Sequence, residues 1–341
     1  MQQGIRTTFL LLSDTHAKNG VAVPDLPVDV AIHCGDLTDG SKIHEFETTL
    51  ALLRSIEAPL KIVIAGNHDF TLDDPVYQEK ADTARRLFSI TPELMRKEYG
   101  NPGDAHRLIS QEPESIHFLD EGTHYFRLSN GADLTVYTSP FTPSIEADWG
   151  FQYKRGDNHD FAIHSKVDVV ITHGPPKGVL DITNSRQRGG CEQLFAAVAR
   201  ARPLLHCFGH IHEGWGGKLV TWRGTEPSEN PSHFTDIDNS ASSVIETLAM
   251  IEPRQSDSAE MKLEKECRLR SLTEEGYRRT SHCSQDESPA RQGQTTLFVN
   301  AAIQSGDEDG RPQLPWVVDI ELPRSTDVGL ETSGASSRTA A

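Results

Sequence analysis

Short apolar runs recur along the chain, and each of them ends in polar residues. The runs are only a few residues long and are rich in β-branched and aromatic side chains, which is typical of strands buried on both faces. We therefore predict strands at residues 9–12, 28–33, 60–65, 134–137, 167–172 and 204–208.

Between the second and third of these runs, apolar residues return with the spacing of a helix. Ser41 precedes this segment and is expected to be its N-cap. The residues that share one face of the predicted helix are Ile43, Phe46, Leu50 and Leu53. A second helix is predicted at 191–201, and the alternation of strands and helices favours an α/β domain.

The composition changes after Trp222. Residues 223–294 contain serine- and proline-rich pieces and a charged stretch, and only 244–251 and 258–272 have helical character. Strand-like segments return at 295–302 and 315–323. We therefore expect one domain formed by 1–222 and 295–323, interrupted by a mostly disordered insertion at 223–294. Residues 324–341 are expected to be a disordered tail.

Charge and cysteine content narrow the classes of function. The formal net charge of −17 argues against a protein that holds long nucleic acids through a basic surface. The five cysteines are scattered and form no CxxC pair, which argues against a disulfide framework or a cysteine zinc site. No segment is long and apolar enough to span a bilayer. These features predict a soluble, cytoplasmic protein that acts away from the membrane.

Polar residues able to bind a metal follow the predicted strands in a regular way. The strand ends lead into Asp-Thr-His, Gly-Asp, Gly-Asn-His-Asp, Thr-His-Gly and Gly-His-Ile-His. In open α/β sheets, ligands bind outside the carboxyl ends of the strands. The oxygen and nitrogen donors expected to converge there are Asp14, His16, Asp36, Asn67, His173, His210 and His212. Such a set suits a pair of divalent transition metals better than magnesium alone.

Each of these pieces alone has an ordinary structural interpretation. A single Asp-x-His or Gly-Asp is common in turns, and a single histidine such as His33 or His206 is usually a buried, hydrogen-bonded side chain. The interpretation as a metal site depends on all the pieces occurring, in order, each at the end of a strand.

The series of motifs resembles the calcineurin-like metallophosphoesterase superfamily. The resemblance covers residues 7–222 and resumes at 295–322, and TSPFTP, WGF and FVNAA resemble its metallophosphoesterase-domain-containing branch. It implies a four-layer αββα sandwich, in which two mixed sheets are flanked by helices. It also implies two divalent metal ions, with manganese, iron or zinc expected.

The resemblance also implies a role for each ligand. Asp14, His16 and His212 would hold one metal ion, and Asn67, His173 and His210 would hold the other. Asp36 would bridge the two. His68 is left without a metal in this scheme, and we expect it to protonate the leaving oxygen, with Asp69 orienting its ring.

The expected activity is hydrolysis of a small phosphodiester or phosphomonoester, such as a cyclic nucleotide, by metal-activated hydroxide. A protein serine/threonine phosphatase that uses the 223–294 insertion is an alternative. A scaffold that keeps the fold without turnover is another, but scaffolds of this kind usually lose ligands, and this chain keeps every one.

Overall fold

The computed structural model describes residues 4–325 except 19, 22, 89 and 306–310. The predicted tail at 324–341 lies outside the described residues, apart from its first two positions. Among the described helices, none combines the length and the apolar character needed to cross a membrane.

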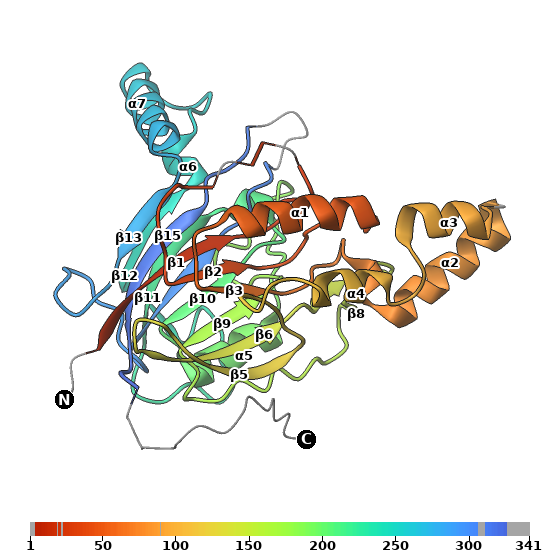
Figure 1. Cartoon of the computed structure of the whole chain (residues 1–341). Coiled ribbons are helices and arrows are strands. Elements are labelled where there is room, and N and C mark those ends of the chain that lie inside the picture. The colour runs from red at the N-terminus through yellow and green to blue at the C-terminus, as the bar shows by residue number, and fades with distance from the viewer. Residues whose placement is uncertain (1–3, 19, 22, 89, 306–310, 326–341) are drawn as a thin grey trace.

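The first sheet contains the strand that opens the described chain and the strand that closes it (Figure 1). β1 pairs in parallel with β2 on one side and antiparallel with β15 on the other, so the sheet is mixed. Its strands, in spatial order, are β13 (Arg278–Ser281), β15 (Trp316–Leu322), β1 (Ile5–Leu12), β2 (Val30–His33), β3 (Leu60–Val63) and β4 (Ile116–Phe118).

The second sheet is also mixed, with a parallel centre and antiparallel edges. β6, β9, β10 and β14 run parallel to one another, and β5 and β11 pair with the outer members antiparallel. In spatial order the strands are β12 (Ile237–Thr247), β11 (Gly216–Trp222), β14 (Thr295–Asn300), β10 (Leu205–Phe208), β9 (Val169–Thr172), β6 (Asp133–Ser139) and β5 (Gly122–Arg127). A small separate sheet pairs β7 (Thr142–Ser144) with β8 (Gln152–Lys154).

Helices cover the outer faces of both sheets and produce four layers. In β1, Phe9 and Leu11 belong to the core between the sheets, whereas Leu10 and Leu12 face the helices α1 (Ile43–Ser55) and α4 (Asp104–Ser110). The second sheet is covered by α5 (Glu192–Ala201) through Leu194, Phe195 and Val198. The predicted sandwich of two mixed sheets is therefore confirmed.

Two helices that the sequence pattern did not predict extend away from the sandwich, α2 (Asp74–Phe88) and α3 (Pro92–Tyr99) (Figure 1). The short 3-10 turn η1 (Phe70–Leu72) follows Gly-Asn-His-Asp, and η2 (His212–Gly214) begins at the last residue of Gly-His-Ile-His. The predicted N-cap of α1 is wrong by one residue, because Lys42 holds that place and the Ser41 hydroxyl accepts the backbone N–H of Thr71 instead.

The expected disorder of 223–294 is wrong for this structure. β12 pairs antiparallel with β11, and β13 pairs in parallel with β15, so the segment adds an edge strand to each sheet. It also forms α6 (Leu248–Ile251) and α7 (Ala259–Glu275), and α7 projects from the body (Figure 1). Edge strands expose much of their surface, and this accounts for a polar composition without disorder. The predicted helix at 244–251 is correspondingly a strand up to Thr247.

Candidate metal centre

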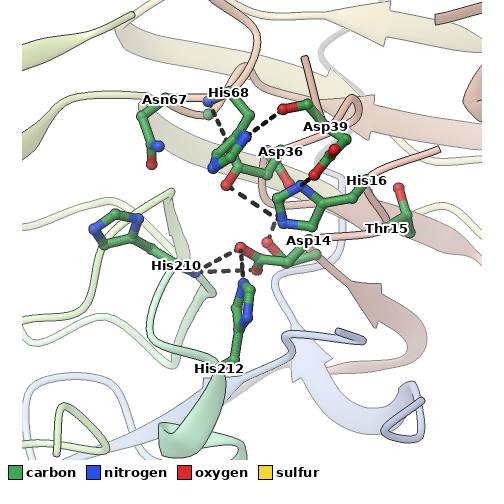
Figure 2. Close-up of polar contacts among 12 residues, drawn as sticks. Asp14, Thr15, His16, Asp36, Asp39, Asn67, His68, His210 and His212 are labelled. Carbon is green, nitrogen blue, oxygen red and sulfur yellow. Dashed lines mark hydrogen bonds and ion pairs between the residues drawn. The ribbon is translucent and has the colours of Figure 1, made fainter. Parts of the chain in front are cut away.

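The loops that follow β1, β2, β3, β9 and β10 meet at one edge of the sandwich. This is the edge where the parallel strands of both sheets end, as expected for ligands of an α/β fold. Figure 2 shows side chains from these loops gathered around a common space. The structure therefore brings together all the predicted donors: Asp14, His16, Asp36, Asn67, His173, His210 and His212.

The first group of donors is Asp14, His16 and His212, whose ligand atoms all lie within 4.8 Å of one another. The Nε2 atom of His212 is 3.3 Å from Oδ1 of Asp14. The Nδ1–H of His16 donates to the carbonyl of Thr38 at 3.0 Å, which leaves Nε2 to face the other donors. The geometry thus allows these three side chains to share one ion.

The second group contains Asp36, His173 and His210, whose ligand atoms also lie within 4.8 Å of one another. Nε2 of His173 lies 3.3 Å from Oδ2 of Asp36 and 3.0 Å from Oδ1 of Asn67, so Asn67 joins this group. Nδ1 of His173 donates to the carbonyl of Cys34 at 2.9 Å, which fixes the ring with Nε2 toward the group.

A third group links the other two. It consists of His16, Asp36 and His68, and Nε2 of His16 is 3.7 Å from Oδ2 of Asp36. Asp36 therefore lies between the first group and the second. Its other oxygen, Oδ1, accepts the backbone N–H of His68 at 2.8 Å, which orients the carboxylate.

The residues present fit divalent metal ions on a direct structural criterion. Nε2 of His16 is buried and has no hydrogen-bond partner among the described residues. An orphaned buried imidazole nitrogen costs free energy unless something occupies the space that it faces. Imidazole and carboxylate donors held by backbone hydrogen bonds on their far sides are the usual surroundings of a transition metal.

The backbone is strained at the donors themselves. Asp14, His16, Asp36 and His210 all adopt left-handed conformations, with φ between 46° and 66°. Such conformations cost about 1–3 kcal/mol each in non-glycine residues and cluster at functional sites. These strained backbone conformations direct the four side chains toward one another.

The glycines of the motifs are required by close approach. A Cβ atom on Gly66 would lie 2.3 Å from Oδ1 of Asp36, and one on Gly209 would lie 2.0 Å from Oδ2 of Asp14. Because these distances are far below van der Waals contact, only glycine lets the loops pack around the two carboxylates.

Charges in the site compensate one another. Burial alone would raise the pKa of Asp36, but His173 and His16 hold it well below its ordinary value. Burial favours the neutral form of His173, but Asp36 and Asp14 raise its pKa to about 9. Burial lowers the pKa of His210 to about 4. The site is thus a cluster of ionised carboxylates matched to imidazoles.

His68 lies at the rim of this cluster. Its Nδ1–H donates to the carbonyl of Asp39 at 2.5 Å, and its ring meets that of His16 edge to face at a centroid distance of 4.7 Å. With Nδ1 occupied, Nε2 is the nitrogen that remains for the site.

The expected role of Asp69 is wrong. Its buried carboxylate accepts the backbone N–H groups of Leu37, Thr38 and Gly66, together with the hydroxyl of Thr38. These bonds use both oxygens, and it is the carbonyl of Asp39, not Asp69, that holds the His68 ring. Asp69 instead joins the loop after β2 to the loop after β3.

Two residues that were not among the predicted site residues hold the loop after β10. The Asn300 amide donates to the carbonyls of Ile211 and Leu180, and the Gln313 amide donates to the carbonyl of His212. Both come from the end of the chain. The FVNAA motif, which contains Asn300, was the available signal for that residue, but it gave no indication of these contacts.

His33 and His206, which were interpreted from the sequence as ordinary buried residues, have the same kind of hydrogen-bond partner. Nε2 of His33 lies 2.9 Å from the hydroxyl of Thr15, and Nε2 of His206 lies 2.8 Å from that of Thr172. Each threonine is a sequence neighbour of predicted metal ligands. Burial lowers the pKa values of His33 and His206 to about 4 and about 3, so both are neutral supports under the site.

Comparison with known proteins agrees with this geometry. Residues 7–214 match the family described as calcineurin-like phosphoesterase. Metallophosphoesterase domain-containing protein 1 of Homo sapiens is 34% identical over 216 residues, which cover 62% of this chain and 62% of that protein. A UPF0046 protein of Caenorhabditis elegans is 30% identical over 213 residues, covering 61% of this chain and 52% of the relative.

A third relative shows how far the match extends. A probable rhamnogalacturonate lyase C of Emericella nidulans is 34% identical over 215 residues, covering 62% of this chain but only 18% of that protein. The chain thus spans less than two thirds of the length of these relatives. A crystal structure of the protein TT1561 from Thermus thermophilus gives a TM-score of 0.39 at 13% identity, covering 63% of this chain and 84% of that one, which adds nothing to the assignment.

The matched residues 7–214 contain every donor described above and more than half of the chain. The chain belongs to the calcineurin-like phosphoesterase family.

Proposed function

We propose that the chain is a phosphoesterase that uses two divalent metal ions. Asp14, His16 and His212 would hold one ion. Asn67, His173 and His210 would hold the other, and Asp36 would bridge them. The observation that carries the proposal is the orphaned Nε2 of His16, which faces Asp36 between the two groups of donors.

When bound, such an ion pair would supply an activated water and neutralise the phosphoryl oxygens of the ester. The protein supplies the arrangement. Backbone carbonyls of Thr38 and Cys34 fix His16 and His173, and the backbone N–H of His210 is bonded to both oxygens of Asp14. Because these partners are backbone atoms, the ligand geometry does not depend on mobile side chains.

We assign to His68 the delivery of a proton to the leaving oxygen. Its Nδ1–H is committed to the Asp39 carbonyl, so a protonated ring has only its Nε2–H to give. His68 also lies in a group with His16 and Asp36, beside the proposed ions. General acid catalysis of this kind typically contributes about 10²–10⁴-fold in rate.

The proposed substrate is a small phosphodiester or phosphomonoester, with nucleotides the first class to test. A cleft of about 670 Å³ opens beside His16 and is lined also by Asp39, His44 and Gln304. That size suits a small organic ligand. The net charge of −17 disfavours a long nucleic acid, because its phosphates are bound mainly through a basic surface. The imidazole-rich ligands favour manganese, iron or zinc.

Hydrolysis of three probes with added Mn²⁺ tests the proposal. Bis(para-nitrophenyl) phosphate, para-nitrophenyl phosphate and a phosphoserine peptide stand for diesters, monoesters and protein substrates. We expect turnover of one of the aryl esters, abolished in Asp36→Asn. Turnover of the peptide alone would favour a protein phosphatase, and turnover of none with any of Mn²⁺, Fe²⁺ and Zn²⁺ would favour a scaffold. The first result would contradict the proposed small-molecule substrate, and the second would contradict the proposed phosphoesterase activity itself.

A further inference from the structure

One aromatic side chain outside the metal loops lies directly against His68. Trp149 belongs to the loop between β7 and β8, and its ring lies 4.4 Å from the His68 ring, centroid to centroid, at an angle of 37°. His16 meets His68 edge to face at 4.7 Å, and Asp39 holds its Nδ1. Among these three contacts, only the contact with Trp149 comes from a segment that contains no proposed metal ligand.

The loop that carries Trp149 is fixed to the loop after β3 by its backbone. The N–H of Gly150 donates to the carbonyl of Asn67 at 3.1 Å. The N–H of Phe151 donates to Oδ2 of Asp73 at 2.8 Å. A Cβ on Gly150 would lie 2.7 Å from the Cα of Phe70, so the two segments are in direct contact. The position of Trp149 relative to His68 is therefore built into the fold.

The indole ring is also supported from its surroundings. Nζ of Lys80, on α2, lies 5.0 Å from the Trp149 ring and 5.1 Å from the Phe70 ring. The Phe70 ring meets Trp149 at 6.1 Å. A cation over an indole face contributes about 0.5–1 kcal/mol at a partly exposed site. α2 thereby helps to hold Trp149 in place.

We propose that Trp149 is a positioning residue, which keeps the His68 ring oriented with Nε2 toward the metal centre. The inference rests on the proposed function, because it gives Trp149 no role except through His68. Without the indole, the His68 ring keeps its hydrogen bond to the Asp39 carbonyl, but it can rotate about that bond into the space that Trp149 had filled. A general acid displaced by about 1 Å can lose about 10²-fold in rate.

The test is a double-mutant cycle on the metal-loaded protein with diphenyl phosphate, or with phenyl phosphate if the protein hydrolyses monoesters. The phenolate leaving group of either ester needs a proton. Trp149→Ala is expected to lower kcat by about 10- to 100-fold with little change in KM. In a His68→Asn background the same substitution should change kcat by less than about 2-fold, since its effect passes through His68. Equal losses in both backgrounds, or a loss confined to KM, would overturn the inference.

Two further variants separate positioning from folding. Trp149→Phe keeps an aromatic face and should retain most of the activity, and Tyr125→Ala removes a ring that is 75% exposed on β5 and should change nothing. Both tryptophan variants should bind metal as the parent does by elemental analysis. If the parent itself hydrolyses no ester, the proposed function fails first.

A structural measurement tests Trp149 without any activity. A crystal structure of metal-loaded Trp149→Ala is expected to show the His68 ring rotated or in several orientations, with the other ligands in place. A His68 ring in its original orientation in that variant would contradict the inference.

Discussion

At the scale of single residues, the positions of the metal-binding carboxylates depend on the glycines that pack against them. Gly66→Ala should reduce metal affinity by about 10-fold or more, because the added methyl group would displace Oδ1 of Asp36. The matched control is Gly40→Ala, where the nearest atom to the new Cβ is 3.8 Å away in the flexible side chain of Glu45. Metal titration of the two variants by calorimetry is the measurement. Equal affinities would mean that the loop gives way without disturbing Asp36.

The division of ligands between the ions is a second prediction about residues. Asn67→Ala and His210→Ala should each leave about one ion per chain, and so should the double variant, because both side chains are assigned to the same ion. Pairing Asn67→Ala with His212→Ala should remove both ions. Elemental analysis after dialysis distinguishes the cases. A double Asn67/His210 variant that loses both ions would show that the assignment is wrong.

His68 is predicted to act on the substrate and not to hold metal. His68→Asn should keep the metal content of the parent and lower kcat by about 10²–10⁴-fold for a phenolate leaving group. The loss should shrink for a nitrophenolate, which leaves as a weak base. Steady-state kinetics with the two esters checks this. Loss of an ion would place His68 among the ligands, in one group with His16 and Asp36.

At the scale of elements, the buried strands were predictable and the edges were not. β2, β3, β9 and β10 are buried along their whole length, so their sequences are continuous apolar runs. β12 buries only two of its 11 positions, and α3 buries none, so neither gives a strong hydrophobic pattern. The order of motifs predicted side chains that the structure brings together at one edge of the sandwich. Asp69 accepts backbone N–H groups from two loops that meet only in the folded protein. The spacing of residues in the sequence could not predict these hydrogen bonds.

A single buried side chain, that of Arg202, contacts both the beginning and the end of the 223–294 segment. The Arg202 guanidinium donates to the carbonyls of Arg223, Gly224, Thr225 and Gly293. Arg202 is only 4% exposed, so removing it leaves several carbonyls without a donor.

Arg202→Ala should therefore destabilise the protein by about 2–4 kcal/mol. The control is Arg200→Ala, an exposed residue of α5, the helix that Arg202 caps, and this substitution should cost less than about 0.5 kcal/mol. Urea unfolding gives both values. If the two variants unfold alike, the segment is held independently of Arg202.

At the scale of the whole molecule, the two sheets form the site together. Asp14 and Asp36 follow strands of the first sheet, and His173, His210 and His212 follow strands of the second. Each proposed ion takes ligands from both sheets, so the metals would join the two halves of the sandwich. We expect metal binding to stabilise the fold as well as to permit catalysis.

The central claim is a dinuclear centre that hydrolyses phosphate esters, and one titration tests it most directly. Protein stripped with a chelator is titrated with Mn²⁺ while hydrolysis of the aryl ester that the protein turns over, bis(para-nitrophenyl) phosphate or para-nitrophenyl phosphate, is followed. The proposal predicts no activity in the stripped protein and a rise that reaches its plateau at two equivalents per chain. A plateau at one equivalent, or hydrolysis that does not depend on metal, would contradict it.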